Sequence, residues 1–199
     1  MIAKYGAPVA GLFSLLLLFQ VSCSSMGHRS VPTDETDFGR LFATGEGYTL
    51  VNLHPDESTR RLSAANYQGA GLLPRCSRVE FTRWSGTEMR FRVVSTGREY
   101  TYEDHPNAVV LFDEHLGRYF SDSCDAMLVE DLSELDRQGV KQGRAMPGMT
   151  KKATVLAIGY PTLSKTPSLL MAEWNYKKTP DKGFVVVFDE KGQVSEIRE

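Results

Sequence analysis

The sequence predicts an α+β protein: a small antiparallel β domain over residues 46–125, then two helices and a three-stranded antiparallel sheet over residues 126–199. Short segments of alternating apolar and polar residues, separated by turn residues, follow one another between residues 46 and 103. A nearly continuous apolar run, Ala153–Ile158, lies between helix-start and helix-stop residues. Three β-type segments with polar turns between them complete the chain.

Residues 1–22 have the anatomy of a signal peptide. Lys4 and the terminal amine make a positive beginning, and Leu12–Phe19 forms an apolar core that is short for a membrane-spanning helix. An uncleaved anchor is the alternative, which the lack of a strongly charged flank disfavours. We therefore expect an exported protein.

The segment Val21-Ser22-Cys23 resembles a bacterial lipobox, although Gln20 stands where that pattern usually has leucine. The resemblance implies that Cys23 is acylated, for instance with palmitate, and becomes the mature N-terminus. Ser24 rather than aspartate follows, which is typical of lipoproteins sent to the outer membrane. Several acyl chains hold a protein firmly to a bilayer, since each buried methylene adds roughly 0.8 kcal/mol. Residues 23–45 are then a lipidated, polar tether to a body on the periplasmic face.

The β domain is expected to be a small barrel or sandwich, because its strands are short and closely spaced. Its segment Leu72–Val79 is similar to the apolar, proline, turn, strand step of bacterial SH3-like domains. Ala108–Phe112 is read either as a closing strand or as a short helix, and Asp113–Asp125 as irregular. Strands are expected at Tyr48–Leu53, Ser77–Trp84, Glu88–Val94 and Glu99–Glu103.

The C-terminal part begins with a helix predicted at Ala126–Gln138 from apolar residues at helical spacing. Thr150 is a suitable N-cap for the second helix, which Gly159 and Pro161 end. Three strands follow, at Ala172–Tyr176, Phe184–Phe188 and Gln193–Arg198.

These C-terminal residues resemble the SmpA/OmlA family of BamE-like outer-membrane lipoproteins. The resemblance covers roughly the last third of the chain. It implies two helices packed on a three-stranded antiparallel sheet, and a role beside the machinery that assembles outer-membrane proteins. The residues that carry it are Gly148-Met149-Thr150, Gly159-Tyr160-Pro161, Trp174-Asn175-Tyr176, Phe184–Phe188, Asp189 and Gly192.

Three cysteines, less a lipidated Cys23, leave Cys76 and Cys124. In an oxidising periplasm two remaining cysteines most simply form a disulfide. Two buried thiols or a redox pair are the alternatives, and the lack of a Cys-x-x-Cys motif disfavours the redox pair.

An interaction surface is predicted on the C-terminal sheet. If Phe184, Val186 and Phe188 face the helices, Val185 and Val187 point outward, with Trp174 or Tyr176 near them. An outward apolar pair must meet either a partner or the β domain.

The remaining sequence disfavours several function classes. A net charge of -2 argues against nucleic-acid binding. His28, His54, His105 and His115 are scattered without metal-ligand spacing. No phosphate loop or nucleophile motif is present. We therefore expect no enzyme activity, cofactor, metal or small-molecule substrate.

The favoured function is an outer-membrane lipoprotein that acts through contact with another envelope protein. The first alternative is a peptidoglycan- or peptide-binding module, which an exposed aromatic groove between Trp84, Tyr100 and Tyr102 would favour. The second alternative, an inhibitor of a periplasmic enzyme, rests on fold analogy alone.

Overall fold

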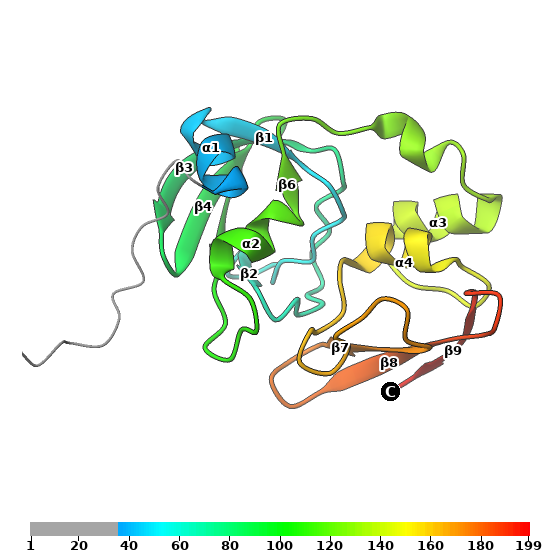
Figure 1. Cartoon of the computed structure of the whole chain (residues 1–199). Helices are drawn as coiled ribbons and strands as arrows, with labels where there is room; N and C mark the ends of the chain where they lie inside the picture. The colour runs from blue at the N-terminus through cyan, green and yellow to red at the C-terminus, as the bar shows by residue number, and fades with distance from the viewer. Residues whose placement is uncertain (1–35) are drawn as a thin grey trace, which may run out of the picture.

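A computed structural model describes residues 36–199, so the predicted signal peptide, Cys23 and the tether up to residue 35 lie outside the described residues. The predicted α+β class is confirmed, with a curled six-stranded sheet and a separate three-stranded sheet (Figure 1). The α-helices are α1 (Asp37–Ala43), α2 (Phe112–Gly117), α3 (Glu134–Gln142) and α4 (Lys151–Ile158). The strands are β1 (Glu46–Thr49), β2 (Arg61–Ser63), β3 (Arg78–Ser85), β4 (Glu88–Val93), β5 (Glu99–Glu103), β6 (Phe120–Ser121), β7 (Glu173–Lys177), β8 (Gly183–Phe188) and β9 (Val194–Arg198).

The larger sheet has the strand order β2-β5-β4-β3-β1-β6. Strands β3, β4 and β5 form the antiparallel meander that the sequence predicts, and Met89, Phe91 and Val93 are buried on its inner face. The expectation of a purely antiparallel sheet is wrong, because β2 pairs with β5 in parallel. Strand β2 precedes the meander in the chain and lies at the edge of the sheet beside β5, the last strand of the meander.

Helix α1 lies within residues that the sequence assigned to the tether. The Thr36 side chain caps it by accepting a hydrogen bond from the Gly39 amide at 2.9 Å. Phe38 and Leu41, one helical turn apart, are both buried. The apolar face of α1 packs into the core. The segment is polar in overall composition, so composition alone does not reveal this helix.

Residues 113–125, expected to be irregular, also form ordered structure. Helix α2 buries Phe112 and Leu116, and Phe120 in β6 is 2% exposed. The apolar residues are spaced for one helical face and are then followed by a two-residue strand, too short to predict from alternation.

The first C-terminal helix begins later than predicted. A short 3-10 helix, η1, covers Ala126–Val129, and α3 begins only after Ser133, whose side chain accepts from the Asp136 amide. Of the two glycines expected to end the helix, Gly139 lies inside it and Gly143 is the left-handed cap with φ 64°. The N-cap at Ser133 therefore sets where the α-helix begins, and the apolar periodicity upstream of Ser133 does not.

The second helix and the meander follow the prediction closely. The side chain of Thr150 caps α4 by accepting from the Ala153 amide, and residues 153–158 of α4 are all buried. Strands β7, β8 and β9 pair antiparallel in sequence order, with a bulge between Val187 and Phe188. The predicted order of two helices and three strands is thus observed.

The two sheets share one hydrophobic core. The carbonyl groups in the last turn of α4 have no partners within the helix, and side chains from the first half of the chain supply them. Asn52 donates to Ala157 O at 3.3 Å and His54 lies 2.9 Å from the same oxygen, while Asn66 donates to Ile158 O at 2.9 Å. The N-terminal half therefore completes the α4 helix.

The structure joins Cys76 and Cys124 in a disulfide, one of the arrangements that the sequence leaves open. It ties the turn before β3 to the loop that precedes η1, across 48 residues of sequence. Among residues 36–199, no helix is both long and apolar enough to cross a bilayer.

Candidate functional site

The structure divides the residues of the predicted interaction surface between the two faces of the C-terminal sheet. Trp174 and Tyr176 are 0% and 3% exposed, and their cross-strand partners are Val186 and Phe184. Side chains paired across strands lie on the same face, so both rings point toward the helices rather than beside Val185. Their placement on the outer surface is wrong, because their hydrogen bonds to Met171 O and Gly159 O hold them inside.

Val185 and Val187 do lie on the opposite face, and both are half-buried. Val187 is paired with Glu173 on β7, and Val185 is paired with Arg198 on β9. Arg198 and Glu173 form an ion pair that reaches across the central strand. The outer face is therefore a narrow apolar strip crossed by charges, which is a weak candidate for a hydrophobic interface.

A run of exposed apolar side chains lies instead just before β7. Leu169, Leu170 and Met171 are 41%, 91% and 38% exposed. Three consecutive large apolar side chains in water are uncommon unless they are contacted by something else. The signal in the sequence is this short apolar run itself, directly after Pro167-Ser168, which sequence reasoning did not single out.

One lysine fixes this exposed loop. Lys151, at the start of α4, donates from Nζ to the carbonyl oxygens of Leu169, Leu170 and Met171 at 3.0, 3.2 and 2.7 Å. The same ammonium lies 5.6 Å from the Trp174 ring centroid and 5.2 Å from that of Phe188. The loop is thus held by its backbone while its side chains remain free.

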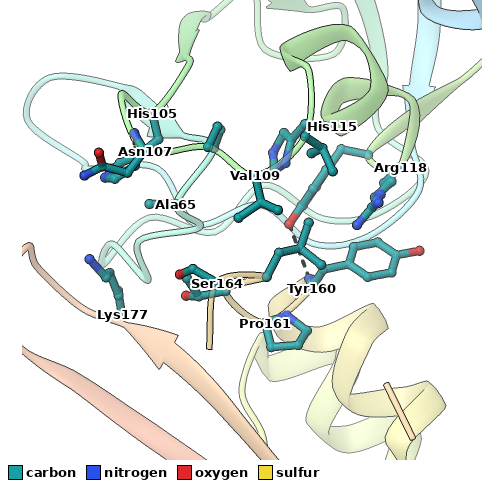
Figure 2. Close-up of a pocket in the computed structure, with 16 residues that line it drawn as sticks. Ala65, His105, Asn107, Val109, His115, Arg118, Tyr160, Pro161, Ser164 and Lys177 are labelled. Atoms are coloured by element: carbon teal, nitrogen blue, oxygen red, sulfur yellow. Dashed lines mark hydrogen bonds between the residues drawn. The ribbon is translucent and has the colours of Figure 1, made fainter. Parts of the chain in front are cut away.

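A second candidate site is a cleft of about 170 Å³ where the two halves of the chain meet (Figure 2). Its walls come from Ala64-Ala65, from residues 105–119 around α2, from Tyr160–Ser164, and from Lys177 on β7. Figure 2 shows Lys177 and Arg118 on opposite sides of the cleft, with Val109 and Pro161 between them.

His115 forms part of the cleft wall and is 7% exposed. Burial, and secondarily the nearby Arg118, lowers the pKa of His115 to about 3. Its Nε2 lies 2.9 Å from the Tyr102 hydroxyl, and its ring stacks on Tyr119 at 4.7 Å between centroids. His115 is therefore neutral near pH 7, and the charge of the cleft comes from other residues.

The aromatic groove that would favour a ligand-binding β domain is not formed by the three rings named for it. Tyr102 is 1% exposed, and a bulge between Phe81 and Arg83 turns Trp84 toward Phe38 of α1, 4.3 Å away between centroids. Helix α1, which sequence reasoning missed, covers this part of the sheet.

Within residues 36–199, no three histidine, cysteine or acidic side chains gather in a way that could hold a metal ion. No known protein family, no characterised protein and no solved structure was found to match this chain.

Proposed function

We propose that this protein is a lipid-anchored envelope protein that acts by contact with another protein, through the Leu169–Met171 loop. The observation that carries the proposal is the exposure of three consecutive apolar side chains on a loop whose carbonyl groups are all bound by Lys151. The contact is non-catalytic and takes place on the periplasmic face of the outer membrane.

Two physical arguments support the loop as the contact. Covering a fully exposed leucine releases water from apolar surface and contributes roughly 1.5–3 kcal/mol. A loop that is already ordered loses little conformational entropy on binding, so more of that gain appears as affinity. The Lys151 hydrogen bonds supply this order in the free protein.

The sequence supports a location at the bacterial outer membrane. The lipobox-like Val21-Ser22-Cys23 favours a membrane anchor, and the order of two helices and three antiparallel strands over residues 134–198 agrees with the resemblance to SmpA/OmlA lipoproteins. We therefore place the partner among the proteins of the outer envelope, including those that assemble the outer membrane. The SH3-like character of the β part is proposed on the same footing, from the Leu72–Val79 step.

The test places a photo-reactive amino acid at Leu170 in the intact lipoprotein. Leu72, which is 42% exposed on the other half of the chain, is the matched control position. We expect a discrete adduct with an envelope protein from position 170 and none from position 72. A Cys23→Ser variant should leave the membrane fraction and lose the adduct. Equal labelling from the two positions would rule out the loop as the contact.

A further inference from the structure

We propose that the cleft between α2, the Tyr160–Ser164 segment and Lys177 binds a small ligand that carries a carboxylate next to an apolar group. The cleft is separate from the Leu169–Met171 loop, so this inference stands independently of the proposed function. Its ligand is either a free aliphatic acid or the carboxyl-terminal residue of a peptide, which share the same chemistry.

The charge of the cleft favours an anion. Its sixteen lining residues include Arg118 and Lys177 and no aspartate or glutamate. Within residues 36–199, Lys177 has no carboxylate partner, and its ammonium lies 6.0 Å from the centroid of the Tyr67 ring. Arg118 and Lys177 line the cleft from opposite sides, so an anion bound between them is attracted by both charges.

Hydrogen-bond donors accompany the cations. In Figure 2, His105 and Asn107 lie at the upper left of the cleft and Lys177 at the lower left, with Ser164 to the right of Lys177. The hydroxyl of Thr162, another lining residue, is buried and has no hydrogen-bond partner in the described part of the chain. Ionised acceptors make the strongest hydrogen bonds with such groups, so a carboxylate fits better than a neutral acceptor.

The middle of the cleft is apolar. Val109 and Pro161 lie between the two cationic sides, the Tyr160 ring lies beneath Arg118, and Ala65 adds a small apolar surface. Val109 is 66% exposed, which leaves room for an aliphatic group to cover it. The volume of about 170 Å³ is below the range usual for drug-sized ligands, so the ligand is small.

Arg118 is already partly occupied. Its guanidinium forms an ion pair with Glu114, one turn earlier on α2, at 3.3 Å. An exposed pair of this kind contributes little, so Arg118 remains able to turn toward an anion in the cleft. Lys177 is the cation without such a competitor, and the inference therefore assigns it the main contact with the carboxylate.

The experiment is an NMR titration of the folded protein with N-acetyl-leucine, and separately with 4-methylpentanoate, which lacks the peptide group. N-acetyl-leucine amide is the uncharged control of the same shape. We expect backbone shifts at Ala65, Val109 and Tyr160 with the acids and none with the amide. Tighter binding of N-acetyl-leucine than of 4-methylpentanoate would identify a peptide terminus as the ligand; the reverse would identify a free acid.

Variants separate a specific site from general attraction. Lys177→Met should weaken binding at least about tenfold, because a hydrogen bond to a charged group is lost. Lys177→Arg should retain most of the affinity, and Lys152→Met, at an exposed lysine of α4, should leave it unchanged. The inference is overturned if the amide binds as well as the acids, if Lys177→Met binds normally, or if the acids produce no shifts in the folded protein.

Discussion

His115 is a titratable residue that is almost fully removed from water. The ring is packed between Tyr102 and Tyr119 beneath the cleft, and it is neutral because no solvent is available to stabilise its charge. His54, at the α4 end of the core, also has a lowered pKa because of burial. Both histidines must bind a proton when the protein unfolds in mild acid.

The sign of the resulting pH dependence follows from this difference. The pKa of His115 is about 3 in the folded protein and 6.5 when unperturbed, so between these values the unfolded state binds more protons. The free energy of unfolding should therefore fall as pH decreases from about 6.5 toward 3. The contribution of one histidine is up to roughly 1.4 kcal/mol per pH unit.

A His115→Gln variant tests this prediction, because glutamine keeps a polar partner for Tyr102 without titrating. Urea unfolding at several pH values should give a shallower acid slope for the variant than for the wild type. Parallel pH profiles for the two proteins would mean that His115 is not the group responsible.

At the scale of elements, Gly69 packs against the chain before β2 more closely than any other glycine of residues 36–199 that lies outside the helices. A Cβ added at Gly69 would lie 2.4 Å from the carbonyl oxygen of Pro55. That oxygen also accepts a hydrogen bond from the Gly71 amide at 3.0 Å, so it has little freedom to move. The two glycines, which mark a loop in the sequence, therefore allow two backbone segments to touch.

We expect Gly69→Ala to lower the free energy of unfolding by about 1–3 kcal/mol, the usual cost of forcing extra atoms into a packed site. Gly117→Ala is the control, because an added Cβ there meets nothing within 4 Å and α2 gains a better helix former. Thermal unfolding of both variants measures the contrast. Equal stability of the two would show that the Pro55 segment gives way.

The elements that sequence analysis predicted well have strong local signals. Strands β3, β4 and β5 alternate cleanly, and α4 has both a capping threonine and a terminating glycine. Helices α1 and α2 were both missed, because seven and six residues are too few to show a period. The parallel pairing of β2 was also hidden, since three residues carry no direction of pairing.

The candidate sites were harder to predict for a related reason. The split of β8 into inner Val186 and outer Val185 followed from alternation, but alternation did not say which face Trp174 takes. The Lys151 contact joins residues 18 to 20 positions apart, and the cleft joins four segments that are distant in the sequence. The Lys151 contact depends on how α4 packs on the C-terminal sheet and the cleft on how the two halves meet, neither of which a local pattern encodes.

At the scale of the whole molecule, we expect the Cys76–Cys124 disulfide to contribute more to the free energy of unfolding than any other single link that a substitution or a reductant can remove. A bridge that closes 48 residues stabilises a fold by about 4 kcal/mol in the chain-entropy account. The double variant Cys76→Ser/Cys124→Ser should therefore unfold at a clearly lower urea concentration than the oxidised wild type.

Reduced wild-type protein is the natural comparison for that variant. It should unfold near the same urea concentration as the double serine variant, and the variant should be insensitive to reductant. An oxidised wild type no more stable than the variant would contradict a structural role for the bridge.

The completion of α4 by Asn52, His54 and Asn66 has a consequence for how the protein is made. The ribosome delivers these three residues first, about 90 to 105 positions before the carbonyl groups that they bind. Until α4 emerges, a nascent chain exposes the apolar side chains that would pack on it. The growing first half is therefore expected to need shielding until α4 emerges, and a translation product that ends before residue 150 is expected to be degraded rather than stored.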